Sequence, residues 1–223
     1  KTTALASRWN MIGGAGGQIY RYDPYEKVGE MILIPADVFP VDSSYNTLGM
    51  TGDENGIIYF GTYNRGYVGM YNPKTGEFTN LSGEMLHDDA MYSGWGGVIL
   101  KDGYLYLSAR GDKNKDSTTT HELIKFDLDK REIVQRLDIT PIMKTSSMDY
   151  LSLVGDVLFG SRARKMNGTI AVDVSGEEMK LIEIEGLPNS FNGAVSNVMN
   201  GKAYMMSVTG QGLLEYDVAT RTA

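Results

Sequence analysis

Short apolar runs alternate with turn residues along the whole chain, and no long segment has the spacing of an amphipathic helix. Five of these runs end in an aspartate or asparagine that is followed by a turn. These residues, which we call the anchor residues, are Asp23, Asn72, Asp127, Asp173 and Asp217. Successive anchor residues are 49, 55, 46 and 44 positions apart. A repeat of this length indicates sheet units that bury their faces by stacking on one another.

A second marker, a tight-turn dipeptide, lies in each interval between anchor residues. The dipeptides are Asn55-Gly56, Asp102-Gly103, Gly155-Asp156 and Asn200-Gly201. Such residues supply the positive φ angles that two-residue hairpins need, so each dipeptide predicts one strand before it and another after it. The strands predicted before the dipeptides are 45–50, 95–100, 148–154 and 193–199, and those after them are 57–61, 104–108, 157–161 and 202–207.

One repeat therefore has an inner strand, a second strand, a third strand that ends in the anchor residue, and an outer strand such as 77–81 or 132–139. Four-stranded antiparallel units of roughly this length are the blades of a β-propeller. We predict an all-β fold, a β-propeller of about five such blades, as a single domain over residues 1–223. The predicted blades are 1–38, 39–86, 87–141, 142–187 and 188–223.

The best-defined repeat is formed by residues 53–62, DENGIIYFGT, and residues 71–78, YNPKTGEF. It resembles the propeller repeats of bacterial two-component sensor ectodomains and of streptogramin-lyase-like proteins. The resemblance implies the propeller fold. It implies no particular function, because this type of repeat serves many roles.

The first and last repeats are incomplete. The first has a third strand at 19–23, an outer strand at 28–34 and a candidate second strand near 8–13, but no inner strand. The last repeat has no outer strand before Ala223. Two arrangements explain this pattern: a five-bladed ring with one incomplete seam, which we favour, or a portion of a larger propeller. An open seam leaves strand edges through which the protein can assemble with another chain.

The composition, with 42% hydrophobic and 22% charged residues, is that of a globular protein. The net charge of −7 argues against nucleic acid as a partner, because binding to a phosphate backbone depends on clustered lysine and arginine. No apolar run approaches the ~20 residues that span a membrane. The chain has no cysteine, and therefore no disulfide or thiolate site. This fits the cytosol and the bacterial envelope equally; we expect an extracellular or periplasmic protein.

In a propeller, the connections from second to third strands and those between blades share one face, and we expect a ligand site there. The predicted ligand-binding residues are Tyr63, Arg65, Trp95, Arg110, Arg162, Arg164, Asn192 and Gln211. Guanidinium groups suit a carboxylate, a sulfate or an acidic sugar, and aromatic rings suit stacking on a sugar. Two alternatives stay open: the arginines pair with nearby aspartates, and Trp95 packs between blades.

The candidates for catalysis are His87 and Tyr92. His87 is followed by two aspartates, so it is a candidate general base or cation ligand, and the alternative is a solvated loop histidine. His121 begins a strand after a polar run, and we expect it on the surface. The sequence has no phosphate-binding loop, no nucleophile elbow and no paired-histidine zinc spacing. We therefore expect no cofactor and no metal.

Three functions are compatible with these residues. The first is a binding propeller that takes a small molecule, a glycan or a protein on the loop face. The second is a scaffold subunit of an envelope or virion assembly. The third is a lyase or hydrolase acting on an acidic carbohydrate, with His87 as base, Tyr92 as acid and two arginines as carboxylate clamps. Whether the chain is an enzyme stays open.

Overall fold

The described residues lie almost entirely in antiparallel strands and in the turns that connect them. The computed structural model describes residues 4–7, 18–35, 37–39, 46–63, 68–82, 90–113, 119–143, 150–161, 169–188, 191–207 and 212–223. They include one four-residue helix, α2 (Thr140–Met143). The predicted all-β class is confirmed.

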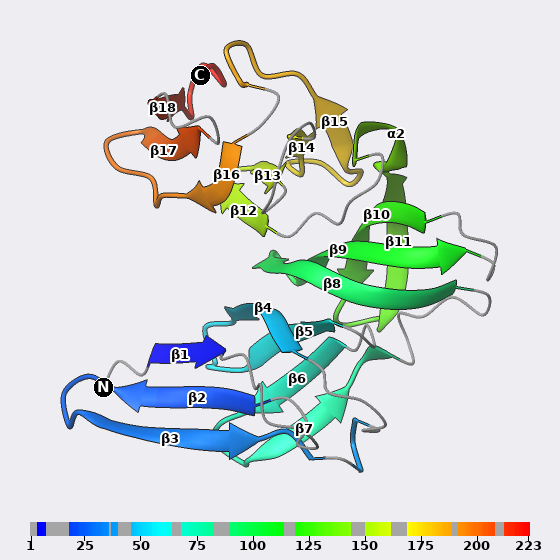
Figure 1. Cartoon of the computed structure of the whole chain (residues 1–223), viewed down its shortest axis with the longest axis vertical. Coiled ribbons are helices and arrows are strands. Elements are labelled where there is room, and N and C mark those ends of the chain that lie inside the picture. Colours follow the sequence, from blue (N-terminus) through cyan, green and yellow to red (C-terminus); the bar gives the residue numbers. More distant parts are fainter. Residues whose placement is uncertain are drawn as a thin grey trace.

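The strands form five successive antiparallel units, which we number blades 1 to 5 along the chain (Figure 1). Among the described residues a single pair, Tyr63 with Gly94, joins blades 2 and 3 into one eight-stranded sheet. Blade 1 contains β1 (Ala4–Ser7), β2 (Gln18–Asp23) and β3 (Val28–Leu33). Blade 2 contains β4 (Asn46–Gly52), β5 (Ile58–Tyr63), β6 (Val68–Asn72) and β7 (Glu77–Asn80). Blade 3 contains β8 (Ala90–Lys101), β9 (Tyr104–Lys113), β10 (Thr119–Asp127) and β11 (Glu132–Asp138). Blade 4 contains β12 (Tyr150–Val154), β13 (Val157–Ser161), β14 (Ile170–Asp173) and β15 (Lys180–Ile182), and blade 5 contains β16 (Phe191–Val195), β17 (Lys202–Ser207) and β18 (Leu213–Asp217).

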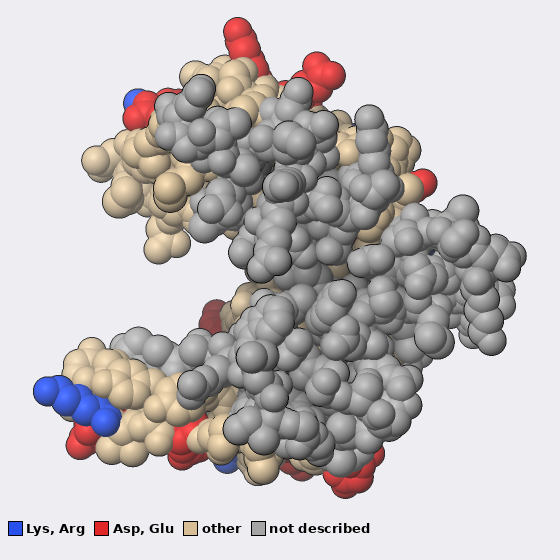
Figure 2. Space-filling view, viewed as in Figure 1, with Lys and Arg blue, Asp and Glu red and all other residues tan. Residues whose placement is uncertain are grey.

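The blades radiate from a common centre (Figure 1). The inner strands contact one another in order, β4 with β8, β8 with β12 and β12 with β16. Gly49 allows one of these close approaches, because a Cβ atom at this position would lie 2.9 Å from the Val98 nitrogen. The protein is a β-propeller. Its blades form an arc, and the space-filling view shows a notch between blade 5 and blade 1 (Figure 2).

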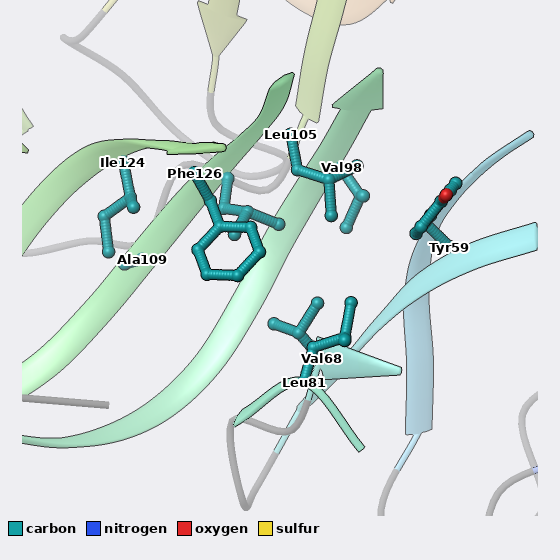
Figure 3. Packing of buried hydrophobic residues seen from close by; sticks show 9 residues of the cluster. Tyr59, Val68, Leu81, Val98, Leu105, Ala109, Ile124 and Phe126 are labelled. Atoms are coloured by element: carbon teal, nitrogen blue, oxygen red, sulfur yellow. The ribbon is translucent and has the colours of Figure 1, made fainter. Parts of the chain in front are cut away.

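Each pair of successive blades shares a hydrophobic core. Figure 3 shows the core between blades 2 and 3, where Val68 lies opposite Leu105 and Phe126. A blade inside the arc therefore buries both of its faces. This is why β13 is buried along its whole length and does not alternate between apolar and polar residues.

The anchor residues build the turns that follow the third strands. In every blade the Oδ1 atom of the anchor residue accepts a hydrogen bond from the backbone N–H two positions later, at 2.9–3.0 Å. The donors are Tyr25, Lys74, Asp129, Ser175 and Ala219. Such a side-chain-to-backbone bond stabilises a tight turn, and the amide of Asn72 provides it as well as the carboxylates do. The sequence repeat is therefore a repeat of turn chemistry.

The second strand of the first repeat is β1, at Ala4–Ser7, where it pairs with β2. The segment 8–13, in which we expected this strand, lies outside the described residues. Two of the four tight-turn dipeptides have positive φ angles at both residues: Asp102 and Gly103 have 51° and 79°, and Asn200 and Gly201 have 52° and 78°. In the other two only the glycine does, with 85° at Gly56 and 58° at Gly155.

One anchor residue also joins two blades. Arg221 of blade 5 donates a hydrogen bond from Nη1 to Oδ2 of Asp173 in blade 4, at 2.6 Å. This hydrogen bond, together with that from the Ser175 N–H, lowers the pKa of the Asp173 carboxyl from 3.8 to about 2. The ionised carboxylate therefore stabilises the folded chain.

We expect Asp173→Asn to lower the free energy of unfolding by about 1–2 kcal/mol at pH 7, because part of the gain implied by the pKa shift is screened by solvent. The folded-state pKa is depressed, so the contribution is fully present above pH 3.8 and is lost as the pH falls toward 2. Urea unfolding of both proteins between pH 7 and pH 2 measures this difference. Asp217→Asn is the control, since an amide keeps the turn bond and this residue forms no ion pair with an arginine among the described residues. A difference for Asp173→Asn that is the same at every pH would contradict the assignment.

Candidate functional site

Both predicted types of connection leave from one end of each blade, which we call the loop end. In blades 2 to 5 the first residue of the inner strand pairs with the last residue of the second strand. The pairs are Asn46 with Tyr63, Ala90 with Lys113, Tyr150 with Ser161 and Phe191 with Ser207. The opposite end carries the tight-turn dipeptides and the turns of the anchor residues. Blades 2 to 5 therefore all have a loop end, as a site built from several blades requires.

Blades 2 and 3 bring three predicted site residues together at their loop ends. Tyr63 in β5 pairs with Gly94 in β8, and Gly94 pairs in turn with Arg110 in β9. Neighbouring strands are ~4.8 Å apart, so the backbones of Tyr63 and Arg110 lie about 10 Å apart across β8. Trp95, which pairs with Ala109, is the next residue along β8. These are positions of the backbone; the side chains of Tyr63, Trp95 and Arg110 lie outside the described residues.

Two further predicted residues also lie at loop ends. Tyr92 pairs with Gly111 in blade 3, and Asn192 pairs with Met206 in blade 5. The other candidates, Arg65, His87, Arg162, Arg164 and Gln211, lie outside the described residues. The convergence of the three arginines and the catalytic roles of His87 and Tyr92 stay predictions.

His121 is not on the surface, as its sequence context suggested, but 1% exposed. It lies on β10 opposite Arg110 of β9, and its backbone N–H donates to Thr140 Oγ1 at 2.9 Å. The signal that would have predicted this burial is the number of positions between His121 and the anchor residue of its strand, Asp127. His121 is six positions before Asp127, so it shares a sheet face with Leu123, which is buried in the core between blades 3 and 4.

The described basic residues near this core have structural partners. Arg136 pairs with the buried Glu122, at 2.9 Å between Nη1 and Oε2. Lys125 is 4% exposed, lies over the Tyr104 ring and donates from Nζ to the Glu177 carbonyl of blade 4 at 2.6 Å. These charges hold strands and blades together. They are therefore poor candidates for binding a ligand.

A shallow hollow of about 500 Å³ lies along the outer part of blade 4. The residues that line it include Ile142, Ile170, Leu181, Ile182, Glu183 and Leu187. It contains none of the predicted site residues. The described residues contain no group of three or more His, Cys, Asp or Glu side chains that could hold a metal ion. Among the same residues, no helix is long and apolar enough to cross a membrane.

Comparisons with known proteins agree with the fold. No protein-family model matches the chain, and no curated protein sequence matches it significantly. Several solved structures are similar. One is a catalytically inactive virginiamycin B lyase from Staphylococcus aureus with quinupristin, with a TM-score of 0.52 and 16% identity over 92% of this chain and 64% of the lyase. A second is the Malassezia sympodialis allergen Mala s 1, with a TM-score of 0.53 and 10% identity over 86% of this chain and 66% of the allergen.

A third similar structure is the extracellular domain of a one-component system from B. thetaiotaomicron, with a TM-score of 0.52 and 14% identity over 90% of this chain and 25% of that one. The predicted resemblance to streptogramin-lyase-like and sensor-ectodomain propellers is thus confirmed for the fold. Sequence identities this low do not show a shared function. The chain spans about two thirds of the lyase and of the allergen.

Proposed function

We propose that this protein is a binding propeller that holds an anionic small molecule or glycan at the loop ends of blades 2 and 3. The observation that carries the proposal is the register that places Tyr63 and Arg110 on either side of Gly94. An arginine and two aromatic residues on three neighbouring strands, with backbones about 10 Å apart at most, are suitable components of a site for a carboxylated sugar. The guanidinium group would pair with the carboxylate, and an aromatic ring would stack on the sugar face.

The overall charge gives this arrangement its selectivity. At a net charge of −7 the protein as a whole repels anions. An anionic ligand therefore needs a local group of positive charges, which Arg110 and the predicted Arg162 and Arg164 would supply. Cations of the structural ion pairs are already neutralised, so they would contribute little to this local field.

We expect Arg110→Ala to weaken binding at least tenfold, which corresponds to about 1.4 kcal/mol, a modest value for a charge-assisted contact. Isothermal titration with uronate oligosaccharides and carboxylated metabolites measures the affinity. Arg21→Ala is the matched control: Arg21 pairs with Glu30 at 2.7 Å in blade 1, and its loss should leave binding unchanged. The proposal fails if no probe loses affinity on Arg110→Ala, or if both variants lose it equally.

We also propose an extracellular or periplasmic location. It is supported by the fold shared with an extracellular domain. Fractionation of cells that express the natural gene, followed by immunodetection, tests it. Detection in the cytosolic fraction alone would overturn the location without affecting the binding proposal.

A further inference from the structure

One rule describes how the blades stack. The residue directly before the anchor residue points toward the preceding blade and is buried there. In blades 2 to 5 these residues are Tyr71, Phe126, Val172 and Tyr216, which are 5%, 0%, 0% and 0% exposed. The equivalent residue in blade 1 is Tyr22, and it is 36% exposed. Blade 1 therefore has the kind of face that packs against a preceding blade, but the described residues include no blade that covers it.

The described large side chains on this face of blade 1 are apolar and open. Its members are Tyr20, Tyr22, Met31 and Leu33, with exposed fractions of 40%, 36%, 61% and 59%. Tyr20 lies directly opposite Met31 across β2 and β3, so the side chains form one surface. The other face of the same sheet carries Ile19 and Ile32, which pack against blade 2.

Blade 5 has an open face of the opposite kind. The third residue after the tight-turn dipeptide points toward the following blade: Tyr59, Tyr106 and Phe159 are 6%, 2% and 0% exposed there. In blade 5 this position is Tyr204, which donates to Glu215 Oε2 at 3.1 Å across the open sheet face. On the same face Met206 and Leu213 form a cross-strand pair and are 60% and 67% exposed. Met205, on the other face, is 1% exposed.

The edge of blade 5 is also prepared for a further strand. In blades 1 to 3 the first residue of the outer strand pairs with the anchor residue five positions earlier. Thr222 pairs in the same way with Asp217. The hydrogen bonds agree, because the Asp217 N–H donates to the Thr222 carbonyl at 2.9 Å. The register of an outer strand is thus set on the open edge of β18.

We propose that the notch between blade 5 and blade 1 is a docking site for further propeller blades, four-stranded sheets of the same repeat with apolar faces. The open face of blade 1 is the face that packs against a preceding blade in blades 2 to 5. The open face of blade 5 is the face that packs against a following blade in blades 2 to 4. A sheet with both faces apolar satisfies both. The comparison with the lyase fits this occupant, since 36% of that chain lies outside the match. This is a little over half the matched length, or two to three blades.

The first test uses the chain as it is. Met206→Lys should leave the urea midpoint of unfolding unchanged, because the face is open. Met205→Lys, its buried neighbour, should lower the midpoint by about 1 M or more. Equal losses would overturn the proposal, since they would mean that the chain covers its own notch. A dimer in light scattering that Met206→Lys dissociates would also overturn it, because the occupant would then be a second copy.

The second test supplies the proposed occupant. A second copy of residues 77–201 placed after Arg221 would provide an outer strand, two complete blades and an inner strand in the repeat's own register. Peroxide oxidation, followed by peptide mass spectrometry, should then modify Met31 and Met206 at least about tenfold more slowly than in the parent chain, with buried Met205 as the internal reference. Unchanged rates in a folded, extended protein would overturn the proposal. If the extension prevents folding, the Met206→Lys and Met205→Lys pair still decides.

Discussion

Replacing Phe159 with alanine is expected to lower the free energy of unfolding by about 3–5 kcal/mol, the cost of deleting a large buried side chain. Phe159 is 0% exposed and belongs to the core between blades 4 and 5. Its ring meets that of Tyr216 edge-on, at 4.9 Å between centroids. Blade 5 has an open face toward the notch, so this core is the main apolar contact that holds it. The cavity left by the alanine therefore cannot be offset by packing from the other side.

Tyr216→Phe is the matched control for this prediction. It keeps the ring but removes a hydroxyl that is buried and has no hydrogen-bond partner among the described residues. Burial also raises the pKa of this phenol, which keeps it neutral. We expect no loss of stability, or a gain of up to about 1 kcal/mol. Urea unfolding followed by circular dichroism measures both variants. A loss for Tyr216→Phe similar to that for Phe159→Ala would show that the hydroxyl, and not the ring contact, supports the interface.

The sequence predicted the fold because its strongest signals are local. An anchor residue such as Asn72 bonds to the backbone two residues later, and a dipeptide such as Asn200-Gly201 sets its own φ angles. Neither depends on distant parts of the chain. The spacing of these markers then gave the repeat, and the repeat gave the propeller. The class, the antiparallel sheets and the resemblance are all confirmed.

Burial was harder to predict because a propeller blade buries both of its faces. The alternation of apolar and polar residues that marks one-sided strands is weak here, and a polar residue such as His121 can be enclosed. Partners of buried charges, such as Arg136 for Glu122, depend on the pairing of β10 with β11. Counting from the anchor residue would have recovered the face of His121, since strand positions alternate strictly.

The candidate site was predictable only to the level of the backbone. Register places Tyr63, Trp95 and Arg110 near one another because Tyr63, the last residue of β5, pairs with Gly94 of β8, which pairs with Arg110 of β9. The direction of a side chain in a connection depends on loop conformation, which has no comparable periodic signal. Candidates such as His87 and Arg162 lie in connections outside the described residues, so their roles stay predictions.

The close approach of the inner strands gives the other large effect. Gly97→Ala is expected to lower the free energy of unfolding by about 2–3 kcal/mol, toward the upper end of the range for overpacking. The added Cβ would lie 2.4 Å from Leu151 Cβ and 3.0 Å from the Leu151 nitrogen, so backbone of β8 meets backbone of β12 and no side-chain rotation relieves the contact.

The same displacement should weaken the bond from the Gly97 N–H to Ser108 Oγ, which is 2.7 Å long. Because Gly97 is two residues from Trp95, the change also tests whether the loop end depends on this contact: ligand affinity should fall together with stability if the site lies there. Gly176→Ala is the control, the same chemical change at an exposed position with no atom within 4 Å of the added Cβ, and it should alter stability by less than about 0.5 kcal/mol. Equal, small effects of the two substitutions in urea unfolding would mean that β8 and β12 do not pack this closely. The radial arrangement of blades 3 and 4 would then be wrong.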